Sequence, residues 1–167
     1  MRLVEQVQAK SDPDPKALAC YGLLLRWLTD EQVSCEKMLL RFVEGRPLSE
    51  ITIQFLAWAC QQVAALGHSV LVMLWDNARW HTSATVRTWI RTHNLTVKRT
   101  GQGVRLLSCL LPVKSPWLNN IEPKWAHAKK RILEPDRTLS KQELADRICH
   151  TFDAEHLDHL PIPEYVL

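Results

Sequence analysis

Residues 71–81 read LVMLWDNARWH, a short apolar run that delivers Asp76 at its end. The preceding residues 69–75 (SVLVMLW) carry no charge. Such a run predicts a strand that is buried on both faces of a sheet with helices packed over it. Open α/β sheets place their functional sites beyond the carboxyl ends of strands, and Asp76 lies at such an end. The function of the chain therefore depends on which side chains lie close to Asp76 in the fold.

Two apolar segments precede this run and predict a hairpin. Residues 17–27 (ALACYGLLLRW) and 37–43 (KMLLRFV) are separated by the polar, turn-forming TDEQ at 29–32. Apolar runs flanking a polar turn are typical of two paired strands. Further along the chain, residues 104–111 (VRLLSCLL) predict another strand, which Pro112 stops, and residues 95–98 a shorter one.

Four helices are expected between and after these strands. Apolar spacing of three and four, together with capping residues, marks their positions. The first helix is capped by Ser49 and ends at Gly67, and its apolar stripe is Ile53, Leu56, Cys60 and Val63. The second is capped by Thr82 or Ser83 and ends near His93 and Asn94, and its apolar residues are Val86, Trp89 and Ile90. The third covers about 119–133, and the fourth begins at a capping box formed by Ser140 and Glu143. The resulting order predicts a mixed α/β layer.

The 167 residues are enough for one domain, which we expect over residues 17–155, with a poorly structured leader at 1–16 and a tail at 156–167. The five cysteines form no CxxC pair or zinc-like cluster, so we expect them to be small buried residues in a reducing cytosol. No signal peptide is present, and no apolar run reaches the roughly 18 residues of a membrane span. These features predict a soluble cytoplasmic protein with no membrane partner.

Charge is distributed unevenly along the chain. The formal net charge is only +3, but residues 77–121 contain no Asp or Glu. The basic residues in that stretch are Arg79, Arg87, Arg91, Lys98, Arg99, Arg105 and Lys114. A face that carried them would attract a polyanion such as DNA, although a scattered set of solvated cations is the competing interpretation. The candidate DNA-binding residues are Arg79, His81, Arg87, Arg91, Lys98, Arg99, Lys114 and Lys124.

Glu122 is the best candidate partner for Asp76. It starts the helix that follows the next firm strand, so the fold could bring both carboxylates to one edge of the sheet. Paired carboxylates suit hard divalent cations such as Mg²⁺, and two such ions stabilise both the attacking and the leaving oxygen of a phosphodiester. Structural alternatives remain for each residue. Asp76 with Asn77 suits an Asx turn, and Glu122 stands at capping-box spacing from Asn119.

Several side chains near these carboxylates also have alternative interpretations. His81 is interpreted first as a packing residue, and otherwise as a metal ligand or a phosphate contact. The tryptophans that flank the two motifs are interpreted as core or cleft walls before base-stacking platforms. They are Trp75, Trp80, Trp117 and Trp125.

The two motifs together are more specific than either carboxylate. LWDNARWH and LLPVKSPWLNNIEPKW resemble the second and third catalytic motifs of DDE transposases of the bacterial insertion-sequence 630 group, within the mariner-like superfamily. CYGLLLRW, RFVEGRPLS and the region from VKR to VRLLSCLLP also resemble that group, so the similarity covers nearly the whole chain.

This resemblance implies a ribonuclease-H-like fold, in which a mixed sheet is flanked by helices. In that family two Asp and one Glu or Asp hold two Mg²⁺ or Mn²⁺ ions that cut DNA and join its ends. Matched by motif, Asp76 is the second catalytic and metal-binding carboxylate and Glu122 the third. The implied activity is DNA transposition by metal-dependent strand cleavage and transfer.

One part of the family pattern has no counterpart here. The first family Asp lies on a central strand upstream of the segment that matches 17–27, and neither Asp12 nor Asp14 lies in an apolar strand. Asp30 and Glu31 fall in a turn, and we expect no counterpart in this sequence of the family's helix-turn-helix that reads the ends of the element. Without that strand two strand edges stay unpaired, so we expect poor stability, association with another copy, or closure by residues 3–7.

These features support three hypotheses. The first is a partial catalytic domain of an insertion-sequence transposase, inactive alone, either a truncated copy or half of a frameshifted product that acts with an upstream fragment. The second is a non-catalytic DNA-binding or interaction remnant. The third is a small nuclease that recruits Asp12 or Asp14 as the missing ligand.

Overall fold

The predicted hairpin is confirmed, with longer strands than expected. In the computed structural model, which describes residues 18–132 and 139–164, β1 (Leu18–Leu28) pairs antiparallel with β2 (Ser34–Glu44). Leu18 lies opposite Glu44 and Leu28 opposite Ser34, so the two strands match along their whole length. The turn between them is closed by hydrogen bonds between Thr29 and Val33 and between Gln32 and Thr29.

One face of this hairpin carries a core built with two helices, α4 (Glu122–Ile132) and α5 (Lys141–Phe152). The alternate residues Met38, Leu40 and Phe42 of β2 are buried in it. The helices contribute Ala128, Ile132, Ala145, Ile148 and Cys149, and Ile121 joins them from just before α4. The predicted capping box is confirmed: the Ser140 hydroxyl accepts from Glu143 N, and the Glu143 carboxylate accepts from Ser140 N. The third helix was expected from about Asn119 but begins at Glu122, after a short 3₁₀ turn (Pro116–Leu118).

The side chain of Trp125 packs directly against Gly22 of β1 in this core. A Cβ built on Gly22 would lie 2.4 Å from Cζ2 and 2.9 Å from Cη2 of Trp125, and 3.3 Å from Cδ1 of Ile121. The same indole meets the Phe152 ring edge-on at 5.3 Å between centroids. The strand backbone is therefore in direct contact with the helix, and no larger residue fits without displacing Trp125.

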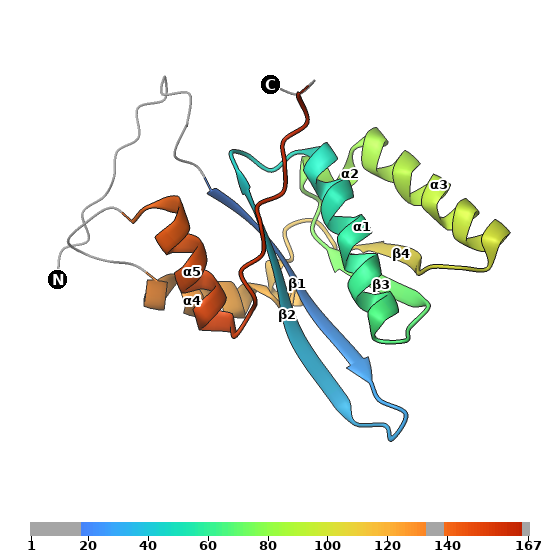
Figure 1. Cartoon of the computed structure of the whole chain (residues 1–167), viewed down its shortest axis with the longest axis horizontal. Coiled ribbons are helices and arrows are strands. Elements are labelled where there is room, and N and C mark those ends of the chain that lie inside the picture. Colours follow the sequence, from blue (N-terminus) through green and yellow to red (C-terminus); the bar gives the residue numbers. More distant parts are fainter. Residues whose placement is uncertain (1–17, 133–138, 165–167) are drawn as a thin grey trace. The chain divides into compact units, whose positions relative to one another are not determined.

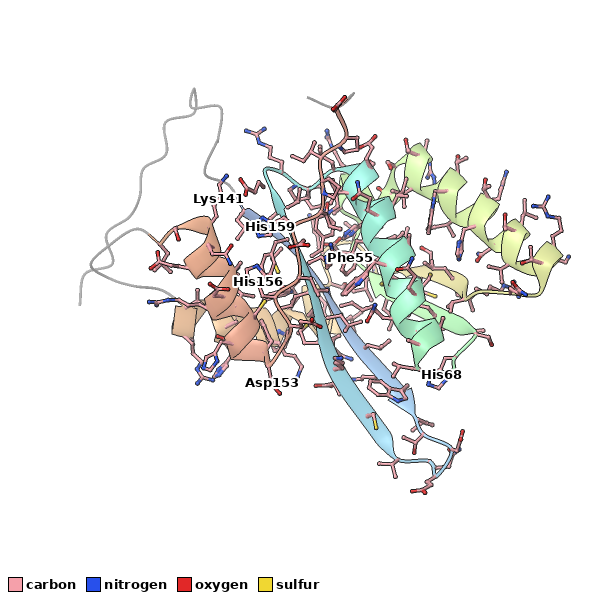
Figure 2. The ribbon with its side chains drawn as sticks, in the orientation of Figure 1. Phe55, His68, Lys141, Asp153, His156 and His159 are labelled. Carbon is pink, nitrogen blue, oxygen red and sulfur yellow. The ribbon has the colours of Figure 1, made fainter. Side chains whose placement is uncertain are left out.

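After α5 the chain continues as an irregular segment that packs on β2. The His156 and His159 rings, which are labelled in Figure 2, lie against Phe42, with centroids 5.6 and 5.9 Å away. His156 Nδ1 is 2.6 Å from Asp146 Oδ1, and the Asp158 carbonyl accepts from Arg41 Nη2 at 2.9 Å. Residues 156–159 of the expected tail are thus ordered by side-chain contacts.

The strand that leads to Asp76 belongs to a second, parallel pair. β3 (Val70–Trp75) and β4 (Arg105–Leu110) run parallel with Val70 opposite Arg105 and Trp75 opposite Leu110. The helices α1 (Ser49–Ala65) and α3 (Ala84–Thr100) lie over this pair (Figure 1). The expectation that the strand is buried on both faces is wrong. Leu71, Met73 and Trp75 are buried, whereas Val70, Val72 and Leu74 are 47, 53 and 57 % exposed.

The helices follow the predictions with three corrections. Ser49 is the first residue of α1 and not its cap, because Leu48 is the N-cap and makes no side-chain hydrogen bond. Gly67, at φ +80°, follows the end of α1 as predicted. A four-residue helix α2 (Arg79–Thr82) precedes Ser83, which caps α3 by accepting from Val86 N at 3.2 Å. The helix α3 does not close near Asn94 but runs to Thr100, so the expected strand at 95–98 is helical.

Asn94 lies inside α3, and its side-chain amide forms hydrogen bonds with the backbone of β4. Its Nδ2 donates to Leu106 O at 2.8 Å, and its Oδ1 accepts from Leu106 N at 2.9 Å. Beside it, His93 Nε2 is 2.8 Å from the Val104 carbonyl. The amide of Asn94 thus satisfies both backbone groups of Leu106, as a neighbouring strand would.

The chain divides into two units, each described by itself. Among the described residues, the hairpin unit comprises 18–46, 120–132 and 139–159, and the parallel-strand unit comprises 47–119 and 160–164. Instead of one mixed sheet, the described strands form two separate pairs, β1–β2 and β3–β4. Within residues 18–132 and 139–164, β1 and β3 each therefore pair along one edge only.

The five cysteines were expected to be buried, and four of them are at least partly so. Cys60 and Cys149 are buried, Cys20 and Cys35 are half-buried, and all five are free thiols. Burial raises the pKa of the Cys60 thiol to about 11, which keeps it protonated and unreactive near neutral pH. The expectation is wrong for Cys109, which is exposed on the uncovered face of β4.

Candidate functional site

Asp76 directly follows β3, as predicted, and its side chain is 59 % exposed. Its Oδ1 accepts from Ala78 N at 3.0 Å, which is the hydrogen bond of an Asx turn. The interpretation of Asp76 as a turn former is thus correct, and the turn uses one of its two carboxylate oxygens. None of the described residues hydrogen-bonds the other oxygen, Oδ2, so one carboxylate oxygen stays available at the end of the strand.

His81 is the second partner of the same oxygen. Its Nδ1 lies 2.8 Å from Asp76 Oδ1. The imidazole is stacked on the Trp75 ring, with centroids 4.8 Å apart and planes at 17°, and it meets Trp80 edge-on at 5.9 Å. His81 therefore packs against aromatic rings, as expected, and also holds the candidate catalytic carboxylate.

The residues around Asp76 are tied to the end of β4. Asn77 Nδ2 donates to Leu111 O at 2.6 Å, and Leu111 N donates to Trp75 O at 2.8 Å. Trp75 is buried and its Nε1 donates to Ser108 Oγ at 3.0 Å. These contacts fix the turn that presents Asp76 to solvent beyond the carboxyl ends of both strands.

Glu122 is the first residue of α4 and is exposed. The interpretation as a capping-box residue three positions after Asn119 is wrong, because α4 begins at Glu122 itself and its first turn closes with Trp125 N donating to Ile121 O. Ile121 and Trp125 anchor this turn in the hairpin core. A carboxylate at the first position of a helix also lies where the helix dipole favours negative charge.

The two carboxylates lie in different units, Asp76 in the parallel-strand unit and Glu122 in the hairpin unit. Their pairing stays a prediction. Over residues 18–132 and 139–164, no group of three or more His, Cys, Asp or Glu side chains is arranged to hold a metal ion. The donor chemistry nevertheless fits a hard cation, because each site presents an exposed carboxylate. Asp12 and Asp14, the alternative third ligands, lie outside the described residues.

Apart from His81, the candidate DNA-binding residues fall into three groups. Arg87, Arg91, Lys98 and Arg99 are exposed on α3. Arg79 is exposed on α2, and Lys114 is exposed after β4 with φ +60°. Lys124 on α4 has its ammonium 2.6 Å from Glu36 Oε1, and with Arg26 it holds the pKa of Glu36 below its usual range. The charge of Lys124 is thus already engaged, whereas the cations of α3 face solvent.

The flanking tryptophans divide between core and surface. Trp75 is buried and Trp125 packs in the hairpin core, as expected. Trp80 is half-buried beside His81. The expectation of a core or cleft wall is wrong for Trp117, which is 73 % exposed in the 3₁₀ turn, next to the exposed Val113 and Leu118. The apolar character of this segment gave no sign that it lies on the surface.

Comparison with known protein families identifies the chain. A sequence model of the family described as DDE superfamily endonuclease matches residues 33–145, more than half of the chain and both carboxylate motifs. The chain belongs to the DDE superfamily endonucleases. No curated protein gives a significant match. The mixed α/β units are consistent with a ribonuclease-H-like DDE domain, and membership indicates a transposase-like nuclease function with DNA as substrate.

DDE superfamily endonucleases generally use divalent metal ions, and the exposed carboxylates Asp76 and Glu122 have the oxygen donors that such ions prefer. Among the described helices of this DDE protein, none combines the length and apolar character needed to cross a membrane.

Proposed function

We propose that the chain is part of the catalytic domain of an insertion-sequence transposase of the 630 group, which supplies two of three metal-binding carboxylates. The observation that carries the proposal is the match of residues 33–145 to the DDE endonucleases, with Asp76 presented at a strand end inside that match. Asp76 and Glu122 would hold Mg²⁺ or Mn²⁺. Such ions stabilise the attacking and leaving oxygens during phosphodiester cleavage and strand transfer.

In this proposal, the remaining carboxylate belongs to a strand that ends in an aspartate, as the family resemblance implies. β1 and β3 each have an edge that pairs with no described strand, and an edge of this kind accepts an added strand through its backbone groups. We propose that an upstream transposase fragment supplies that strand, whereas a second copy of the chain would cover only the unpaired edges. The chain alone is then inactive. It would act in the cytoplasm at the nucleoid.

A cleavage assay tests this proposal. Purified chain with Mg²⁺ or Mn²⁺ is expected to nick supercoiled DNA no faster than buffer. Addition of the polypeptide encoded immediately upstream, if one frame there encodes a strand ending in Asp, is expected to restore nicking. Asp76→Ala or Glu122→Ala should then return it to background. Metal-dependent nicking by the pure chain that Asp76→Ala abolishes would contradict the missing-carboxylate proposal.

The second candidate function is DNA binding without catalysis, and the basic face of α3 favours it. This helix exposes four cations, and residues 77–121 contain no acidic side chain to oppose them. Its exposed threonines, among them Thr88 and Thr92, add hydroxyl groups of the kind that contact phosphates. Binding through such a face is sequence-tolerant and falls steeply with salt.

Charge reversal on α3 separates this candidate from catalysis. The triple variant Arg87→Glu, Arg91→Glu, Arg99→Glu is expected to lower duplex DNA affinity at least about tenfold and to reduce the salt slope by about 3, because each lost phosphate contact removes about one unit. Fluorescence anisotropy at several salt concentrations measures both quantities.

Lys129→Glu, Lys130→Glu, Arg131→Glu on α4 is the matched control, because it changes the net charge equally on another helix. Equal losses in both variants would show that net charge, and not the face of α3, governs binding. If the chain binds DNA without catalysis, Asp76→Ala and Glu122→Ala are expected to leave its DNA affinity unchanged.

A further inference from the structure

His81 and Ala78 N converge on one oxygen of Asp76. The Nδ1–Oδ1 distance is 2.8 Å and the N–Oδ1 distance is 3.0 Å, so Oδ1 has two donors when Nδ1 carries its proton. Within the part of the chain that the structure describes, Oδ2 has none. A carboxylate fixed through one oxygen cannot rotate freely about its Cβ–Cγ bond, and its second oxygen keeps one direction.

The imidazole is itself fixed. The Trp75 ring is stacked on it with the two ring centroids 4.8 Å apart, and the Trp80 ring meets it edge-on at an interplanar angle of 77°. Trp75 is held in turn by burial and by the Nε1–Oγ bond to Ser108 at 3.0 Å. A chain of contacts therefore runs from the inner face of β3 and β4 through the aromatic rings to the carboxylate.

We propose that His81 is a positioning residue for Asp76, which directs Oδ2 toward a divalent cation. This inference rests on the proposed function, because it assumes that Asp76 is a metal ligand. The contact of Nδ1 with Asp76 Oδ1 makes His81 a partner of the ligand and not a ligand through the same nitrogen. Partners of this kind orient carboxylate and histidine ligands, and their loss typically lowers metal affinity about 10- to 100-fold.

Two substitutions separate positioning from packing. His81→Phe keeps an aromatic ring on Trp75 and removes the N–H donor. His81→Asn loses the stacking but places its amide Nδ2 near the position of Nδ1. Mn²⁺ binding, followed by water-proton relaxation, is expected to weaken about 10- to 100-fold in His81→Phe and to stay within about threefold of wild type in His81→Asn. Circular dichroism checks that both variants are folded.

Asp76→Ala is the reference for the site, and it separates this inference from the proposed function. If Asp76→Ala abolishes Mn²⁺ binding and His81→Phe leaves it unchanged, positioning by His81 is wrong while the metal-binding role of Asp76 stands. If wild type and Asp76→Ala bind Mn²⁺ equally, the metal-binding role of Asp76 fails, and the positioning role of His81 fails with it. A larger loss in His81→Asn than in His81→Phe would assign His81 to packing alone.

A second measurement requires no metal. Nitrogen-15 NMR of the histidine ring reports which nitrogen carries the proton. The inference requires an N–H at Nδ1 of His81, and this proton is expected to disappear from the hydrogen-bonded region of the spectrum in Asp76→Ala. A neutral ring protonated at Nε2 alone would overturn the inference, because its Nδ1 has no proton to donate to the carboxylate.

Discussion

Gly22→Val is expected to lower the free energy of unfolding of the hairpin unit by about 3 kcal/mol, because a side chain here enters space that Trp125 occupies. A Cβ alone would lie 2.4 Å from Cζ2 of the indole, well inside van der Waals contact. Displacing the indole ring costs free energy, since it packs on Phe152 and against the core between the hairpin and α4 and α5. Urea unfolding followed by circular dichroism measures the loss.

A double-mutant cycle shows whether the clash is the cause. Gly22→Ala alone should cost about 1–3 kcal/mol. In the Trp125→Phe background, which lacks the clashing atoms, the same change should cost at least about 1 kcal/mol less. If the cost of Gly22→Ala is the same in both backgrounds, the contact between Gly22 and Trp125 does not limit this position.

Asn94→Leu is expected to destabilise the parallel-strand unit by about 2–6 kcal/mol. The substitution leaves the N–H and the C=O of Leu106 without their partner, and each unsatisfied buried group costs about 1–3 kcal/mol. Leu106 is 1 % exposed, so water offers little replacement. Urea unfolding measures the loss, which is a large part of the total stability of a small domain.

Two further variants define the cause. Asn94→Asp keeps the size and the acceptor but replaces the Nδ2 donor with an oxygen facing Leu106 O, so it should be clearly destabilising as well. Thr92→Leu changes an exposed polar residue of α3 to leucine and should shift stability by no more than about 0.5 kcal/mol. A loss in Asn94→Leu no greater than that of Thr92→Leu would contradict the role of the amide bridge.

The predictable parts of this fold are those specified by neighbours in sequence. The hairpin, the cap of α3 at Ser83, the stop at Gly67 and the capping box at Ser140 depend on residues within a few positions, and all are present. Asn94 shows the limit. A polar residue that follows a histidine resembles a helix end, but its amide is bonded to a strand twelve positions away.

The run that precedes Asp76 shows a second limit. The apolar side chains of residues 70–75 show that both faces of the strand could be buried, but they do not show which other elements cover each face. Helices cover one face of β3, and the valines of the other face stay half-exposed. The sequence placed Asp76 at a strand end correctly. The contact with His81 escaped prediction, because the direction of the His81 side chain depends on the backbone of the turn that joins β3 to α2.

The composition of β3 has a consequence for the fate of the polypeptide in a cell. Its six residues, VLVMLW, contain no charge, proline or glycine, and one edge of the strand has no partner among the described residues. Segments of this kind stack readily into fibrils when they are exposed on many copies at once. A chain produced in quantity is therefore expected to aggregate unless another strand pairs with that edge.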